Sequence, residues 1–325
     1  MNIVYKIELL FLKSVRRMYR ALHKNPSYNH TTIADDQVSN YIKELLLNDK
    51  PCMVGRFGCT EFDATYFPYV LKQSLFNRYK FFIQGYIPTI RDNQNLKQKY
   101  VDVISFYSGF FPNKPELINT FSDLMVDSMK QVDLLGVVPW NKEDLFAKEY
   151  HKRCVFSKYD TIEPYDYEHP WSKALEGKKV LVIHPFEKTI QMQYKKRELL
   201  FANKDVLPAF ELITLKAVQT IAGEQAEFET WFDALAYMEN QIDQIDFDVA
   251  IIGCGAYGFP LAAYCKKIGK KAIHLGGATQ ILFGIKGKRW EELPEVASLM
   301  NEHWVRPLPE ETPKQNKKVE GGCYW

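Results

Sequence analysis

The second half of the chain alternates short apolar runs with segments of helical periodicity. The apolar runs of strand length are 179–185, 210–217, 248–253 and 271–277. The segments with helical spacing lie at about 187–201, 227–241 and 258–268. Near-continuous apolar strands that alternate with helices are typical of a parallel sheet buried on both faces. The pattern therefore predicts an α/β fold that is Rossmann-like and doubly wound, with a mostly parallel sheet.

The first half of the chain adds further elements to this sheet. Apolar strands are expected at 51–57 and 133–138, and helices at 35–48 and from about residue 60. Residues 156–172 are rich in Tyr, Pro, Asp and Glu and are expected to form a loop. The predicted organisation is a basic helix with a linker, a Rossmann-like domain and an irregular tail, over 1–32, 33–305 and 306–325. The tail is expected to pack either over the cleft or on a remote surface.

Residues 3–23 have the apolar spacing of an amphipathic helix with a strong basic bias. The only acid in this segment is Glu8, and the cations are Lys6, Lys13, Arg16, Arg17, Arg20 and, just beyond it, Lys24. One interpretation is a helix that lies in the interface of a membrane as a peripheral contact. The other is a helix whose apolar face packs on the domain while its cations remain in water.

Composition narrows the range of partners and compartments. The chain has 325 residues with 42 basic and 40 acidic side chains, so the net charge of +2 does not favour nucleic acid as a partner. Six scattered cysteines without a C-x-x-C pair disfavour a disulfide framework or zinc site and suit a reducing compartment. No apolar run approaches the ~20 residues that span a bilayer, and no secretory signal is recognisable. We expect a cytoplasmic protein, with at most peripheral contact with the inner face of the membrane.

The segment Gly253-Cys254-Gly255-Ala256-Tyr257-Gly258 matches G-x-G-x-x-G between a strand and a helix. Glycines let the backbone approach a phosphate, and the helix start offers N–H groups to it. A dinucleotide site also needs an acid about 20 residues later to hold the ribose. The next strand instead ends in Leu275-Gly276-Gly277 without an acid, so a dehydrogenase is disfavoured. The glycines also suit tight strand–helix packing without any ligand, and that alternative stays open.

Three further groups are expected at the same carboxyl edge of the sheet, where ligands of open α/β sheets bind. Gly276 and Gly277 end the strand next to the glycine turn, and Gln280, Lys288 and Arg289 follow them. Cations beside a glycine-rich edge suit a diphosphate, although a solvated basic loop has the same composition. His184 ends another strand and is either a base, a phosphate contact or a structural histidine.

A third strand ends in the turn Arg56-Phe57-Gly58-Cys59-Thr60-Glu61. Arg56 suits a phosphate clamp, and Glu61 in the first helical turn suits a base, a sugar-hydroxyl contact or a metal ligand. A structural Arg–Glu pair at the helix start is the alternative. The turn resembles the R-F/Y-G-D-G-E turn of GT-D type glycosyltransferases, which are bacterial sugar-transfer enzymes with a D-x-E motif after the first strand. The layout of the second half is also similar to theirs.

The resemblance implies a nucleotide-sugar donor, most often a UDP-sugar, a divalent metal (Mn or Mg), and a glycan or lipid-linked acceptor. Glu61 would act at the sugar or hold the metal, and Gly58 and the glycine edge would hold the donor. One departure bears on the metal: Cys59 stands where the family has the first acid of D-x-E, and hard cations prefer oxygen ligands. Another surface-polysaccharide transferase, such as a pyruvyl transferase, and a non-catalytic nucleotide-sugar-binding protein are the alternative functions.

Overall fold

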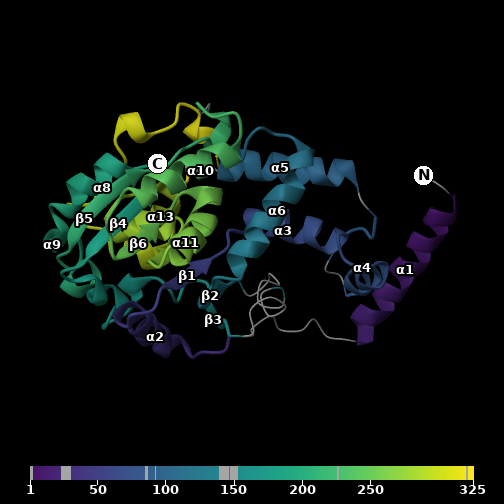
Figure 1. Ribbon diagram of the computed structural model, residues 1–325, viewed down its shortest axis with the longest axis horizontal. Coiled ribbons are helices and arrows are strands. Elements are labelled where there is room, and N and C mark those ends of the chain that lie inside the picture. Colours follow the sequence, from purple (N-terminus) through teal and green to yellow (C-terminus); the bar gives the residue numbers. More distant parts are fainter. Residues whose placement is uncertain are drawn as a thin grey trace.

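The computed structural model describes residues 3–22, 31–84, 87–91, 93–138, 146, 153–224, 227–319 and 321–325. Within them, seven parallel strands form one sheet in the order β3-β2-β1-β7-β6-β4-β5. The strands are β1 (Cys52–Arg56), β2 (Leu134–Val137), β3 (Val155–Lys158), β4 (Lys179–His184), β5 (Glu211–Lys216), β6 (Val249–Ile252) and β7 (Lys271–His274). Helices flank the sheet, as Figure 1 shows. The predicted Rossmann-like α/β fold is confirmed.

Successive residues of the central strands point into two separate apolar cores. In β6, Ala250 and Ile252 belong to one core, whereas Val249 and Ile251 belong to the other. Side chains alternate between the faces of a sheet, so a strand covered on both sides must be apolar throughout. This is why the sequence shows continuous apolar runs at these strands and not an alternating pattern.

Helices from both halves of the chain cover the two faces. The helices that contribute to the first core are α3 (Cys59–Leu71), α4 (Leu75–Ile83), α5 (Gln94–Ser108), α6 (Ile118–Met129), α10 (Trp231–Asp243) and α11 (Gly258–Lys267). Those that contribute to the second are α2 (Asp35–Leu47), α8 (Glu187–Tyr194), α9 (Arg197–Leu200), α12 (Ala278–Leu282), α13 (Lys288–Glu292) and α14 (Pro294–Ala297). Short 3₁₀ turns connect them, and the five-residue turn Trp171–Leu175 packs in the second core.

The N-terminal helix α1 (Ile3–Leu22) confirms the helix predicted over 3–23, apart from residue 23, which lies outside the described residues. It packs beside α4 at the end of the molecule away from the sheet (Figure 1). Its buried residue Leu12 joins the first core. None of the helices in the described part of the chain combines the length and apolar character needed to cross a bilayer.

Three local predictions were wrong in part. Residues 156–172 were expected to form a loop, but β3 begins at Val155 and pairs with β2 through Lys158 as an edge strand. The segment 187–201 forms two helices, α8 and α9, because the chain turns at Lys195 and Lys196. The helix expected from residue 227 begins at Trp231, where Thr230 and Asp233 form a capping box.

The tail after residue 305 contains only two 3₁₀ turns among its described residues, Pro309–Glu311 and Asn316–Lys318. It nevertheless packs into the second core through Val319, Cys323 and Trp325. Of the two positions considered for the tail, the structure therefore shows packing over the carboxyl edge of the sheet. Glu311 holds the preceding stretch in place, since its carboxylate accepts hydrogen bonds from the backbone N–H groups of Lys188 and Thr189.

Chain connections diverge at the carboxyl edge of the sheet. From β4 the chain continues to the edge strand β5, whereas from β6 it continues to β7 on the opposite side. Such a switch point opens a crevice outside the carboxyl ends of the strands. The ends of β4 and β6, at His184 and Ile252, are therefore where the topology places a ligand site.

Candidate functional site

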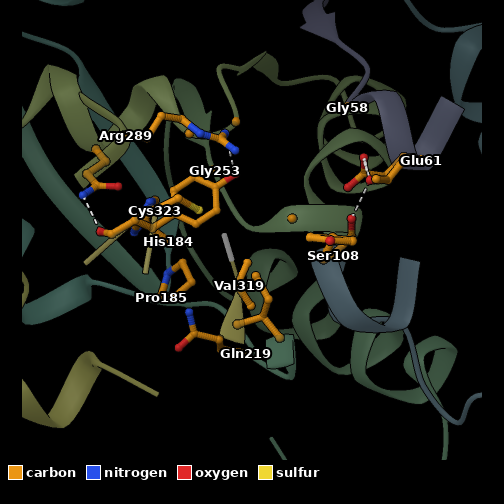
Figure 2. A pocket seen from close by; sticks show the side chains of 18 of the residues that line it. Gly58, Glu61, Ser108, His184, Pro185, Gln219, Gly253, Arg289, Val319 and Cys323 are labelled. Atoms are coloured by element: carbon orange, nitrogen blue, oxygen red, sulfur yellow. Dashed lines mark hydrogen bonds between the residues drawn. The ribbon is translucent and has the colours of Figure 1, made fainter. Parts of the chain in front are cut away.

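A cavity of about 400 Å³ opens at this carboxyl edge. Its volume lies within the range of ligand-binding pockets. Ten of the predicted site residues line it: Arg56, Gly58, Glu61, His184, Gly253, Gly255, Gly276, Gly277, Gln280 and Arg289. Figure 2 shows Gly58, Glu61 and Ser108 on one side of the cavity, and Arg289, Cys323 and His184 on the other. The topology thus brings together residues that are more than 200 positions apart in the sequence.

Three predicted site residues lie outside the lining. Tyr257 is buried and stacks on Trp231 at 4.8 Å between ring centroids. A Cβ at Gly258 would lie 2.4 Å from His274 Nε2, so this glycine permits close helix–strand packing. Lys288 is exposed at the start of α13. The second half of the G-x-G-x-x-G turn therefore serves packing, and the cavity is lined by its first half.

The two glycine loops touch each other. A Cβ at Gly253 would lie 2.4 Å from the carbonyl oxygen of Gly276, a clash that only glycine avoids. Gly255 has a φ of 56°, and a Cβ there would lie 2.9 Å from the carbonyl oxygen of Ser108. Backbone that follows β6 and β7 and the end of α5 consequently converges at the floor of the cavity.

Arg56 is bound from several sides at the end of β1. Its Nε and Nη2 donate to the carbonyl oxygen of Leu275 at 2.9 and 2.5 Å, and Nη1 donates to Glu163 Oε1 at 2.6 Å. The guanidinium also lies 4.2 Å from the centre of the Tyr159 ring. Burial alone would lower the pKa of Arg56, but Tyr159 and Glu163 together raise it above its ordinary value. Arg56 pairs with Glu163 and not with Glu61, so it ties β1 to β7 and to the loop after β3.

Glu61 lies at the start of α3 with its carboxylate turned back over Gly58. A Cβ at position 58 would lie 2.0 Å from Glu61 Oε2, so the glycine makes room for this carboxylate. Thr60 Oγ1 donates to Glu61 Oε2 at 2.8 Å and lies 2.9 Å from Ser108 Oγ. Because the single Thr60 proton goes to the carboxylate, Ser108 is the donor to Thr60. The hydrogen bonds from Ser108 to Thr60 and from Thr60 to Glu61 therefore fix the carboxylate. We call this side of the cavity, formed by Arg56, Thr60, Glu61 and Ser108, the β1 wall.

Two buried histidines end strands β4 and β7 at the cavity. The backbone N–H of Phe186 donates to His184 Nδ1 at 3.0 Å, so Nε2 carries the proton of the neutral ring. His274 Nδ1 lies 2.9 Å from the carbonyl oxygen of Arg56 and must donate to it, which leaves Nε2 as an acceptor. Burial lowers the pKa of each to about 3, and for His274 the charge of Arg56 adds to the effect. Both are neutral near pH 7.

The opposite wall consists of α13 and the tail. Arg289 Nη1 donates to the hydroxyl of Tyr324 at 3.2 Å, and its guanidinium lies 5.1 Å from the centre of that ring. Gln280 Nε2 donates to the carbonyl oxygens of Lys286 and Tyr324 at 2.9 and 2.8 Å, which holds the tail against the glycine edge. Burial raises the pKa of Tyr324 to about 12. This wall, which we call the tail wall, is formed by Gln280, Arg289, Tyr324 and Trp325. It presents a cation and aromatic rings to the cavity.

Sequence reasoning missed several residues that line the cavity: Thr60, Ser108, Tyr159, Phe186, His274, Tyr324 and Trp325. A signal existed for His274, since it ends an apolar strand as His184 does. Tyr324 and Trp325 belong to the tail, for which the sequence left open a position over the cleft and one on a remote surface. Ser108 carries no local signal, because it reaches the cavity only through the packing of α5.

The donor set does not fit a metal centre built by the protein. No group of three or more His, Cys, Asp or Glu side chains suited to a metal occurs among the described residues. Among the described residues that line the cavity, Glu61 is the one acidic side chain, and Cys59 is exposed beside it at the position of the missing acid. A hard cation such as Mg²⁺ prefers several oxygen ligands, which Glu61 alone does not supply.

Comparisons with protein-family models, with curated proteins and with solved structures found no match for this chain. The structure therefore assigns the chain to a fold class and to no family: it is an α/β protein with a doubly wound, all-parallel sheet. Any function rests on the geometry of the cavity and on the resemblance of the Arg56–Glu61 turn.

Proposed function

We propose that the chain is a glycosyltransferase that moves a sugar from a nucleotide sugar, most simply a UDP-sugar, to a glycan acceptor of a cell-surface polysaccharide or glycoprotein. One observation carries the proposal. A single cavity at the switch point of the sheet holds a fixed carboxylate, Glu61, on one wall and a cation beside aromatic rings, Arg289 and Tyr324, on the other. Both kinds of group suit sugar transfer from a nucleotide sugar, because a carboxylate can take the proton of the acceptor hydroxyl and a cation can stabilise the departing diphosphate.

The donor would bind between the glycine loops and the tail wall. Its diphosphate fits against the backbone at Gly253 and Gly276, where side chains are absent, with Arg289 as the charged partner. The Nε2–H of neutral His184 can donate to a phosphate oxygen without adding charge. Tyr324 and Trp325 offer ring faces for the nucleobase.

Glu61 would act at the acceptor side as the general base. A carboxylate held by the Thr60 hydroxyl accepts the proton of the attacking sugar hydroxyl, while negative charge develops on the departing diphosphate. Arg289 and the N–H groups near the glycine loops stabilise that charge, and such stabilisation is usually a large part of catalysis. Arg56 would hold the site in shape instead of contacting the donor, because its Nε, Nη1 and Nη2 each donate to a protein oxygen of Leu275, Tyr159 or Glu163.

We propose a cytoplasmic location for this reaction, in keeping with six cysteines that are scattered along the sequence without a C-x-x-C pair. The tail wall, and not Lys288, supplies the cation to the leaving group, since Lys288 is exposed outside the cavity lining.

The experiment is release of free sugar from a panel of UDP-sugars, measured for the wild type, Glu61→Gln and Cys59→Ala. Glu61→Gln keeps the size and the Thr60 acceptor but removes the base, so turnover is expected to fall by about 100- to 10,000-fold. Cys59→Ala is the control two residues earlier on the same cavity lining and should keep turnover. If the wild type binds UDP-sugars but releases no sugar, the proposed enzyme activity is wrong and the chain is a non-catalytic binding protein. Equal turnover in wild type and Glu61→Gln would remove Glu61 from the reaction.

A further inference from the structure

Helix α1 is anchored to the protein along one side. Leu12 on that side is buried, with 5% of its surface exposed. Glu8 accepts from the hydroxyl of Tyr79 and from Arg91 Nη2, the latter at 3.1 Å. The guanidinium of Arg16 lies 5.3 Å from the centre of the Phe82 ring. These contacts fix which side of the helix faces outward.

The outward side carries a stripe of large apolar side chains, which we call the apolar stripe. Its members are Ile7, Leu10, Phe11, Met18 and Leu22, exposed by 63%, 65%, 67%, 64% and 77%. Leu10 and Phe11 follow Ile7 by three and four residues, Met18 follows Phe11 by seven, and Leu22 follows Met18 by four, so all five lie on one face of a helix. A helix that packs only on a core buries such a stripe, and large exposed apolar patches mark interaction sites.

A basic strip runs along one flank of the apolar stripe. Lys13, Arg17 and Arg20 are exposed and follow one another at four and three residues, so they share a face. None of the three forms an ion pair with the described residues of the chain. The helix thus has a buried side, an apolar side and a basic strip between them.

We propose that α1 docks on an anionic lipid surface, with the apolar stripe at the acyl boundary and the basic strip among the headgroups. This arrangement is that of interfacial helices, which combine apolar insertion with attraction to anionic lipids. The charge argues against a second copy of the chain, since two basic strips would repel. α1 lies at the end of the molecule away from the sheet, where a flat surface can approach it (Figure 1). The buried side of the helix agrees with the packing interpretation of residues 3–23, and the proposal assigns the membrane contact to its outward side.

The test is flotation of the full chain with vesicles of phosphatidylcholine alone or mixed with phosphatidylglycerol in equal parts. The wild type is expected to float with the mixed vesicles, and added salt should weaken binding because it screens the headgroup charge. Leu10→Ser/Phe11→Ser/Met18→Ser removes three inserted side chains and should weaken binding by on the order of 100-fold. Lys13→Gln/Arg17→Gln/Arg20→Gln should abolish the preference for the mixed vesicles.

The matched control is Met192→Ser/Leu199→Ser, which changes two exposed apolar residues on α8 and α9. It should float as the wild type does, and circular dichroism should show all variants folded. The proposal is overturned if the wild type stays in solution with both vesicles, or if the stripe variant floats equally well. It is also overturned if light scattering shows a dimer that the stripe variant dissociates, because a second copy would then cover the stripe.

Discussion

The two walls of the cavity each contain an arginine, and the two arginines have different roles. On the β1 wall, Arg56 is 3% exposed and donates to the carbonyl oxygen of Leu275 and to Glu163. On the tail wall, Arg289 is half-buried and lies beside the rings of Trp290 and Tyr324. Both arginines line the cavity, but only the first joins three segments of the fold through its hydrogen bonds. Residue type alone therefore does not distinguish an arginine that joins segments of the fold from one that contacts aromatic rings; the groups around each arginine do.

The largest expected effect is a difference in stability between variants of the two arginines. Arg56→Ala leaves the Glu163 carboxylate without its cation and should lower the free energy of unfolding by about 3–5 kcal/mol. Arg289→Ala removes a more exposed group and should cost under about 1 kcal/mol. Urea unfolding followed by circular dichroism measures both. Equal losses of unfolding free energy in the two variants would mean that Arg56 and Arg289 contribute equally to stability.

Acid should destabilise both walls through their histidines. The folded pKa of His184 and of His274 is lowered to about 3 from 6.5, so the unfolded chain binds these protons first as pH falls. Their stabilisation is complete above pH 6.5 and is lost progressively toward pH 3. Protonation linked to each histidine should lower the free energy of unfolding by about 2 kcal/mol between pH 7 and pH 5.

The variants His184→Asn and His274→Asn test this linkage. An asparagine can keep the bond to the Phe186 N–H or to the Arg56 carbonyl, but it does not titrate. Each variant should flatten the fall of the unfolding free energy with acid, measured by urea titration across this range. An unchanged pH slope in both variants would show that other groups control acid unfolding.

The tail wall should control affinity for the donor. Tyr324→Leu keeps an apolar side chain but removes the ring that lies beside Arg289, so affinity for a UDP-sugar should fall about tenfold. The measurement is calorimetric titration with the donor. Tyr237→Leu, an exposed tyrosine on α10, is the control and should bind as the wild type does. If both variants bind equally well, the base does not stack on the tail.

The smallest expected effect is on the β1 wall. Ser108→Ala removes the donor to Thr60 and loosens Glu61, so kcat should fall about threefold while KM stays constant. Ser108→Thr retains a hydroxyl and should restore kcat. A loss that Ser108→Thr does not restore would point to packing of α5 instead of the hydrogen bond.

The sheet was predictable because its strands are apolar throughout, and the meeting of the Gly253 and Gly276 loops followed from parallel strands ending at one edge. The role of Arg56 was not, because its partners Leu275 and Glu163 lie 219 and 107 residues away. β3 was also missed, since it is a short edge strand whose pairing with β2 is not visible in local periodicity. Long-range contacts of this kind leave no spacing signal.

In the proposed function, one wall of the cavity binds the donor and the other performs the chemistry. Calorimetric titration of a UDP-sugar into the wild type, Glu61→Gln and Arg289→Ala separates these two roles. We expect Glu61→Gln to bind with the affinity of the wild type, and Arg289→Ala to bind at least about tenfold more weakly. If the wild type binds no UDP-sugar, or if all three proteins bind it with equal affinity, the two walls do not divide the work in this way.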